Sequence, residues 1–441
     1  MARKLSSTMD VVPESVVGLG KFSDSMTSTE GDTDTSMVKN PEVQVARALK
    51  KVGEPLYARL ISLRRWLHQH PELSFQEAET AERVISELER LGIAYDYAGV
   101  GHAVIATIDG RDMSIPAIAL RAEMDALPGD ETTGTPYASI YPGRMHACGH
   151  GAHMAMLIGA AHLLRKNPAP GPVRLVFQPA EEKGGGARTA ITDGALTGVS
   201  AIFAGHVTNE FETGKMMIRD GSVTAQSDRF CITVRGKGGH GARPHEAVDA
   251  VVISGFLIAA LQTLVSREIN PLHASVVTIG KIRAGSAANV IAEHAELLGS
   301  IRSLRKDVRQ HIHSGLKRMV SAAAELHNAE IEIRIDEGYP PVVNEPVSTS
   351  IARQAAIEVV GGDAVVAAEF PSMGSEDFSY YLHEIPGCFV RFGTRHPDWE
   401  PIPLHSPAFD IDERALAIGT LFFDRVARVA HEHMEEIPDG V

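Results

Sequence analysis

Short aliphatic runs that alternate with helix-like segments are the feature that most limits what this chain can fold into. Runs typical of buried strands cover residues 103–108, 117–120, 173–177, 201–203 and 388–392. Around and between them, apolar residues recur at helical spacing over 44–67, 76–91, 154–164, 187–193, 347–359, 376–383 and 413–431. Buried strands that alternate with helices form sheets with helices on both faces. We therefore predict an α/β fold with an α/β/α layer order.

The middle of the chain has a different order of elements. Strand runs at 230–234, 275–279, 295–301 and 331–335 combine with helices at 247–264 and 308–326 in the order β-α-β-β-α-β. This is the order of a ferredoxin-like module. We predict that residues 228–336 form such a unit, inserted into a first domain made of residues 41–227 and 337–441.

The N-terminal segment has a different composition. Residues 1–40 are rich in Ser, Thr, Asp and Gly and contain few large apolar residues. Because such a segment cannot bury enough apolar surface to order itself, we expect a disordered extension. The alternative is an arm that packs on a partner subunit. Asp10, Pro13 and Glu14 interrupt the stretch where a signal peptide would be apolar, and no uncharged apolar run reaches the about 18 residues of a membrane-spanning helix.

Charge and cysteine content argue against several classes of function. The 441 residues include 42 basic and 56 acidic side chains, which gives a formal net charge of −14. Nucleic-acid-binding and membrane-surface proteins instead carry basic patches. Three cysteines, Cys148, Cys231 and Cys388, cannot form a disulfide framework, and their odd number favours a reducing compartment. We therefore expect a cytoplasmic protein without nucleic-acid or membrane partners.

Metal-type ligands gather at the predicted ends of the strand runs. They are Cys148, His150, Glu182, His206 and His405. In open α/β sheets, ligands bind at the carboxyl ends of the strands. Thiolate, imidazole and carboxylate together suit Zn²⁺ or a related ion such as Mn²⁺ or Co²⁺. Each residue alone also has an ordinary structural interpretation, such as a small buried cysteine or a solvated acidic turn, but their joint placement favours a divalent metal site.

Several motifs also carry a family resemblance. They are Ala119-Leu-Arg-Ala-Glu-Met-Asp-Ala-Leu-Pro128, His146-Ala-Cys-Gly-His150, Phe177-Gln-Pro-Ala-Glu-Glu182, Gly236-Lys-Gly-Gly-His-Gly-Ala-Arg-Pro-His245 and Gly374-Ser-Glu-Asp-Phe378. Together they resemble the M20 metallopeptidase family, in particular its amidohydrolase branch, which cleaves N-acyl amino acids, hippurate and auxin–amino acid conjugates. The resemblance implies a zinc-peptidase-like catalytic domain, a ferredoxin-like lid through which the chain forms a homodimer or a higher homo-oligomer, and one or two divalent ions, Zn²⁺ or Mn²⁺.

The resemblance also implies roles for individual residues. The metal ligands are matched by Cys148, His150, Glu182, His206 and His405, with Cys148 in the position that bridges two ions. Glu181 matches the general base that activates water, and Asp125 matches the acid that orients His150. On the inserted module, His240 matches a histidine that reaches an active site across the dimer and polarises the scissile group, and Asn289 matches a substrate contact.

Three positions depart from the family's pattern near the expected pocket. Gly151 stands where the family has an aspartate, Ala292 where it has a proline, and Val207-Thr-Asn-Glu210 where an aromatic residue and a proline are common. The missing aspartate is expected to remove a carboxylate that orients the ligands, a change that typically costs about 10–100-fold in metal affinity or activity.

These observations leave three functions open. The leading hypothesis is a metal-dependent hydrolase that cleaves the amide bond of an N-acyl or N-aroyl amino acid, a small carboxylate-bearing substrate. One alternative is a hydrolytic deaminase of an aminobenzoate-type aromatic amine, similar to 5-nitroanthranilate aminohydrolase, which releases ammonia. The other is a catalytically inactive metal-binding scaffold; the presence of Glu181 argues against it, because a scaffold does not need a base.

Overall fold

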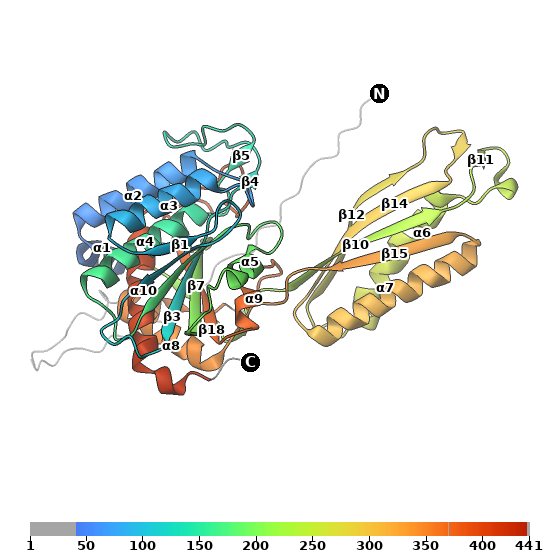
Figure 1. Ribbon diagram of the computed structural model, residues 1–441. Coiled ribbons are helices and arrows are strands. Elements are labelled where there is room, and N and C mark those ends of the chain that lie inside the picture. Colours follow the sequence, from blue (N-terminus) through green and yellow to red (C-terminus); the bar gives the residue numbers. More distant parts are fainter. Residues whose placement is uncertain (1–40, 369, 439–441) are drawn as a thin grey trace, which may run out of the picture.

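The computed structural model describes residues 41–368 and 370–438, which form a large helix-covered body and a smaller one beside it (Figure 1). The extension expected at residues 1–40 lies outside the described residues.

The larger body is built on an eight-stranded sheet in the order β1-β2-β6-β3-β7-β18-β8-β17. Its strands are β1 (Tyr95–Tyr97), β2 (Val104–Ile108), β3 (Ala117–Glu123), β6 (Val173–Gln178), β7 (Val199–Glu212), β8 (Met216–Met217), β17 (Val365–Val366) and β18 (Gly387–Arg395). The central strands β6, β3, β7 and β18 run parallel, while β2 joins β6 and β8 joins β18 in antiparallel pairs. The predicted α/β class is confirmed, with a parallel-rich sheet at its centre.

Helices cover both faces of this sheet. One face carries α1 (Pro41–Val52), α2 (Glu54–Gln69), α3 (Ala78–Arg90), α4 (His150–Lys166), α8 (Pro346–Val360) and α10 (Ala415–Glu432), which pack into the larger hydrophobic core. The other face carries α5 (Gly186–Thr192) and the short α9 (Ser379–Leu382), which pack over a smaller core. Helices therefore lie on both sides of the sheet, as the alternating pattern predicts.

Two of the expected helices differ from the structure. The single helix expected over residues 44–67 is two helices, α1 and α2, separated at Gly53. Gly53 has a φ of 81°, a left-handed conformation that glycine adopts easily, and Pro55 lies in the first turn of α2, where its missing N–H is not needed. The helix expected over 376–383 is reduced to α9, because the Glu376 carboxylate instead accepts a hydrogen bond from the Phe378 backbone.

Several polar residues of the large sheet lie on the face that carries α5 and α9. On β3, Ala117 and Ala119 belong to the smaller core, and strand alternation then places Arg121 and Glu123 on the same face. The same alternation places three further polar residues on this face. They are Gln178 on β6, His206 on β7 and Arg391 on β18. Polar groups thus replace the core at the carboxyl ends of β3 and β6 and in the middle of β7 and β18.

The smaller body contains an antiparallel sheet in the order β12-β14-β10-β15. In chain order its elements are β10 (Gln226–Arg235), α6 (Ala250–Thr263), β12 (Ser275–Ala284), β14 (His294–Ser303), α7 (Lys306–His327) and β15 (Glu330–Glu337). The short strands β11 (Gly239–His240) and β13 (Val290–Ile291) pair at its end remote from the large sheet (Figure 1). We call this smaller body the lid; its limits at 228 and 336 and its ferredoxin-like class stay predictions.

Among the described residues, the segment Ala250–Glu268 is long and apolar enough, by length and composition, to cross a membrane. It contains α6, and Ile253, Leu257 and Leu261 on one face of α6 are buried in the core of the lid. We therefore interpret it as a helix packed on the lid's sheet.

We predict that Gly159 in α4 cannot be replaced without loss of stability. A Cβ atom at this position would lie 2.3 Å from Thr420 Oγ1 of α10 and 3.0 Å from Leu60 Cδ1 of α2. Overpacking of this kind costs about 1–3 kcal/mol, so Gly159→Ala should lower the melting temperature in calorimetry. The control is Gly151→Ala in the same helix, whose Cβ would lie 3.4 Å from Leu67 Cβ, an ordinary contact. Equal melting temperatures for the two variants would contradict this account of the α4–α10 packing.

Candidate metal-dependent active site

Asp125 lies just beyond β3 and is buried at the centre of the site. Its carboxylate accepts hydrogen bonds from the backbone N–H groups of Glu181 (3.1 Å) and Glu182 (3.0 Å) and from the Ser74 hydroxyl (2.7 Å). His150 Nδ1 lies 2.8 Å from the Asp125 carbonyl oxygen and 3.4 Å from its carboxylate. Asp125 therefore holds together the loop of Glu181 and Glu182 and the first residue of α4.

The five ligand candidates come together around Cys148. The Cys148 Sγ atom lies 3.3 Å from His206 Nε2 and 3.3 Å from His405 Nε2. The ligand atoms of Cys148, His150 and His206 lie within 4.8 Å of one another, and so do those of Cys148, Glu182 and His405. Two groups of three ligands thus share one thiol.

The orientation of the histidines fits a metal. His150 Nδ1 and His206 Nδ1 face the backbone carbonyls of Asp125 (2.8 Å) and Val207 (2.7 Å). Since a carbonyl oxygen only accepts, each Nδ1 carries the proton and each Nε2 keeps its lone pair for the cluster. His150 Nε2 is buried without a hydrogen-bond partner among the described residues. These residues therefore fit divalent metal ions.

Two residues of the site have an unusual backbone conformation. Ala180, next to Glu181, has a φ of 52°, and His405 has a φ of 66°. Left-handed conformations are uncommon outside glycine and persist where surrounding contacts fix them. The Ala180 N–H donates to Glu77 Oε1 (2.8 Å), and the His405 N–H donates to the Ala147 carbonyl (2.8 Å). The local strain coincides with the two loops that bring Glu181, Glu182 and His405 to the site.

The site is crowded with acidic groups. Burial raises the pKa of Glu181 well above its usual range, and the nearby carboxylates Glu376 and Glu182 raise it further. Burial, with Glu182 and Glu181, likewise raises the pKa of the Cys148 thiol. Like charges in a low-dielectric site repel strongly, so bound cations would stabilise the ionised cluster.

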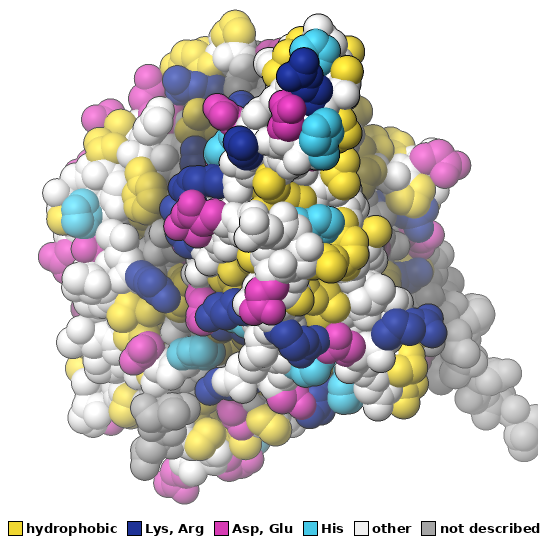
Figure 2. All heavy atoms as spheres, turned by 90° about the vertical axis from the view of Figure 1, so that its right-hand side faces the viewer, with side chains coloured by type: hydrophobic (Ala, Val, Ile, Leu, Met, Phe, Trp, Pro, Cys, Tyr) yellow, Lys and Arg dark blue, Asp and Glu magenta, His cyan; other side chains and the backbone are white. Residues whose placement is uncertain are grey.

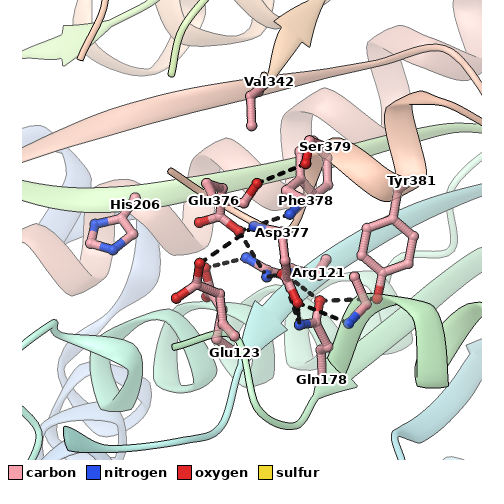
Figure 3. A network of polar contacts seen from close by, with 12 residues as sticks. Arg121, Glu123, Gln178, His206, Val342, Glu376, Asp377, Phe378, Ser379 and Tyr381 are labelled. Atoms are coloured by element: carbon pink, nitrogen blue, oxygen red, sulfur yellow. Dashed lines mark hydrogen bonds and ion pairs between the residues drawn. The ribbon is translucent and has the colours of Figure 1, made fainter. Parts of the chain in front are cut away.

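Beneath the cluster lies a network built on Arg121, which Figure 3 shows. The Arg121 guanidinium is fully buried and bonds Glu123, Gln178 Oε1 (2.8 Å), Glu376 Oε1 (3.0 Å) and Asp377 Oδ1 (2.7 Å). Glu376 and Asp377 follow the lid in the sequence, whereas Arg121 precedes it. The network therefore joins the two parts of the chain that form the large sheet.

The Arg121 network continues to a metal-ligand candidate through a histidine. His153 Nδ1 lies 2.8 Å from Glu123 Oε2, and His153 Nε2 accepts a hydrogen bond from the Val207 N–H (2.9 Å), next to His206. Neither Glu123 nor His153 is among the site residues predicted from the sequence. The signal that could have found them is the Arg121-Ala-Glu123 pair inside an otherwise apolar strand, because buried charges are rarely left unpaired.

Tyr339 is a second contact that the sequence analysis missed. Its hydroxyl donates to the Glu181 carbonyl (2.7 Å) and accepts from the Gly184 and Gly185 N–H groups (3.2 and 3.1 Å). Tyr339 lies two residues after β15 ends, where the chain returns from the lid. It therefore links that return to the loop of Glu181.

Two expectations about the site are wrong. His206 was expected beyond the end of its strand, but β7 continues to Glu212 and His206 lies within it, paired with Arg391 of β18. The absence of an aspartate at position 151 was expected to remove a carboxylate that orients the ligands, but a Cβ at Gly151 would face α2, 3.4 Å from Leu67 Cβ and 3.7 Å from the Arg64 carbonyl oxygen. The reason is the helical rotation of about 100° per residue, which turns position 151 away when His150 faces the cluster.

The segment after His206 has a structural function. Asn209 Nδ2 donates to the carbonyls of Ile402 (3.2 Å) and Asp410 (3.0 Å), on both sides of His405 in the sequence. This departure from the family pattern thus holds the loop that carries a ligand candidate.

Two candidate residues lie elsewhere. His240 is in β11, and Asn289 contacts that ribbon through its carbonyl, which accepts from the Gly241 N–H (2.8 Å). Figure 1 shows β11 at the end of the lid remote from the large sheet. The fold of one chain does not bring His240 and Asn289 to the ligand cluster.

A cavity of about 690 Å³ lies between the large body and the lid. Cys148, Glu181, His206 and His405 line it from the large body, and residues of β10, β14 and β15 line it from the lid. Such a volume is typical of a small-molecule site.

Comparison with known proteins agrees with this geometry. Residues 119–429 match the peptidase family M20/M25/M40. The chain is 40% identical over 380 residues to an N-acetylcysteine deacetylase of Bacillus subtilis. This match covers 85% of this chain and 98% of that protein. It is 37% identical over 377 residues to the IAA-amino acid hydrolase ILR1-like 4 of Arabidopsis thaliana, covering 82% of this chain and 83% of that protein.

Among solved structures, a similar one is the Bacillus subtilis YXEP protein, described as a dinuclear metal binding peptidase from the M20 family. The TM-score is 0.75 with 37% identity, and the match covers 86% of this chain and 99% of that one. The chain therefore belongs to peptidase family M20, and it is a metal-dependent hydrolase that acts on carbon–nitrogen bonds.

We predict that Cys148→Ser lowers the metal content of the protein. A thiolate is a softer and tighter ligand than a hydroxyl for Zn²⁺-like ions, and Cys148 is shared by both ligand groups. Metal per chain, measured by plasma mass spectrometry after dialysis, should fall. The matched control is Cys231→Ser on β10 of the lid, which should keep its metal. Full metal content in the Cys148 variant would place the thiol outside the ligand set.

Proposed function

We propose that this protein hydrolyses the amide bond of an N-acyl or N-aroyl amino acid. The observation that carries the proposal is the position of Glu181 beside the two ligand groups that share Cys148. All of these residues except the buried His150 line one cavity. A deacetylase of an N-acyl amino acid and a hydrolase of an indole-acyl amino acid are among the similar proteins, which supports this substrate class.

The ligand groups favour two divalent ions, Zn²⁺ or Mn²⁺, and Cys148 would contribute to both sites because it belongs to both groups. One ion would be held by His150 and His206 and the other by Glu182 and His405. When bound, such ions supply Lewis-acid activation of water and of the scissile carbonyl.

Residues of the chain would then transfer the proton and hold the reacting groups in position. Glu181 accepts the proton of the attacking water and delivers it to the leaving nitrogen. Asp125 keeps Glu181 in place through the hydrogen bond from the Glu181 N–H and orients His150. Tyr339, bonded to the Glu181 carbonyl, limits movement of the same loop.

The first test of the function is Glu181→Gln. The variant should keep its metal, because Glu181 is proposed as a base and not as a ligand, and should lose roughly 10²–10⁴-fold in turnover. The protein without substitutions, called the parent, is screened with N-acetyl, N-benzoyl and indole-acetyl amino acids. Glu182→Gln serves as the contrast, since loss of a ligand should lower metal content as well as activity. A Glu181 variant that keeps more than a tenth of the parent activity would rule out its role as the base.

The products decide between amide hydrolysis and the deaminase alternative. Amide hydrolysis releases a carboxylic acid and an amino acid in equal amounts, whereas hydrolytic deamination releases ammonia and no acid. Both products are measured in the same reaction with hippurate-like and aminobenzoate-like substrates. Ammonia without acid would replace the proposed function by the deaminase.

We also propose that the active form is a homodimer assembled through the lid. Strand β12 is at the edge of its sheet, and Val252 (60% exposed) and Phe256 (44% exposed) of α6 are large apolar side chains at the surface. Figure 2, which looks at the molecule from the lid end, has hydrophobic side chains at the surface among charged ones. An unpaired edge strand and an apolar helix face are suited to a second copy of the chain.

In a dimer, His240 and Asn289 would lie near the cavity of the partner subunit. Because β11 is remote from the ligand cluster of its own chain, His240 would reach the partner's cavity, where it polarises the scissile carbonyl. His240 is surface-exposed, and His240 Nδ1 accepts from the Ala242 N–H (3.0 Å), which leaves Nε2 to carry the proton that it donates.

We predict that the Glu181→Gln and His240→Ala variants complement each other. His240→Ala should lower kcat by roughly 10²–10³-fold, the range for loss of one oxyanion donor, with unchanged metal content. In a mixed dimer, one site receives both an intact Glu181 and an intact His240, so activity should return after subunit exchange. Exchange is monitored by native mass spectrometry. Complete exchange without recovered activity would contradict action across a dimer.

A further inference from the structure

Arg391 on β18 lies beside the ligand cluster, and neither the metal site nor the base uses it. It pairs in register with His206 of the parallel strand β7. Paired residues of neighbouring strands project from the same face of a sheet, so the Arg391 side chain shares the face of a metal-ligand candidate. It lines the same cavity as Cys148 and His405.

The Arg391 guanidinium has no close partner of its own. Among the described residues it makes no hydrogen bond, and its ion pair with Glu210 Oε2 is long, at 3.9 Å. The Arg391 side chain is 14% exposed, whereas that of Glu210 is 68% exposed. By contrast, Arg121 bonds three carboxylates, and Arg188, another arginine of the cavity, lies 4.2 Å from the ring centre of Tyr380.

A largely buried arginine whose ion pair is long and lies at the surface is unfavourable. Guanidinium stays protonated in proteins, and burial of a charge without a counter-charge costs free energy. Burial lowers the pKa of Arg391, although Glu210, Glu376 and Cys148 oppose the effect. A bound anion in the cavity would remove this penalty.

We propose that Arg391 binds the α-carboxylate of the substrate and thereby selects N-acyl amino acids over other amides. This inference rests on the proposed function. In such a substrate a single carbon separates the α-carboxylate from the scissile nitrogen, so its receptor must lie next to the ligand cluster. The strand register places Arg391 there, and the planar fork of a guanidinium matches a carboxylate.

The test measures binding separately from turnover. In the Glu181→Gln background, calorimetry compares N-acetyl-L-alanine and hippurate with their α-carboxamides, using metal-loaded protein. The carboxylates should bind more tightly than the carboxamides, and Arg391→Gln should weaken only the carboxylates, by about 10–100-fold. Arg391→Lys should restore part of the affinity, because it keeps the charge without the fork.

Arg188→Gln is the matched control, since its guanidinium already stacks on Tyr380; it should keep the preference for carboxylates. Equal weakening of carboxylate and carboxamide, or no preference in the parent, would overturn the role of Arg391. If Arg391→Gln keeps the parent's preference for carboxylates over carboxamides, the role of Arg391 is likewise overturned. The carboxylate would then bind to arginines on the lid wall of the cavity, such as Arg229 and Arg302.

The same experiment separates this inference from the proposed function. If the parent hydrolyses no N-acyl amino acid but its carboxylate binding depends on Arg391, the carboxylate site stands and the proposed reaction fails. If the parent hydrolyses these substrates while Arg391→Gln keeps the same preference for carboxylates in kcat/KM, the proposed reaction is supported and the role of Arg391 is contradicted.

Discussion

The buried ion pairs of Arg121 are the interaction on which the rest of the structure depends. One guanidinium on β3 forms ion pairs with Glu123, Glu376 and Asp377, which come from both sides of the lid in the sequence. Removal of one partner from such a cluster costs about 3–5 kcal/mol, because it leaves a buried charge without compensation. The ion pairs therefore close the large sheet and form the base on which the metal-ligand candidates rest.

The chemistry is concentrated where the small core ends. Apolar residues fill the α5–α9 face along the first part of the central strands, and polar residues follow further along each strand. The wall of the cavity formed by the large body carries Glu181, Glu182 and Glu376, and these acidic residues attract cations. Asp125 accepts from the Glu182 N–H, and His153, paired with Glu123, accepts from the N–H of Val207, next to His206. These bonds help to orient two ligand candidates.

The lid gives the site its second wall. Its sheet contributes residues of β10, β14 and β15 to the cavity, and the Arg302 guanidinium donates to the Ser375 hydroxyl of the large body (2.8 Å). Tyr339 connects the end of the lid to the loop of Glu181. A change in lid position would therefore be transmitted directly to the proposed base, which is how lids commonly couple closure to chemistry.

The sequence by itself determined the α/β class and the metal-dependent hydrolase family, because strand runs, helical periodicity and the ligand-bearing motifs are local patterns. It also contained Cys148, His150, Glu182, His206 and His405, but in separate segments. Only the tertiary structure decided that these side chains meet around one thiol, that Gly151 faces α2, and that Arg391 lies beside His206 with only a long ion pair to Glu210 among the described residues. Strand register and the rotation of side chains around a helix decide such contacts, and both depend on how distant segments pack together.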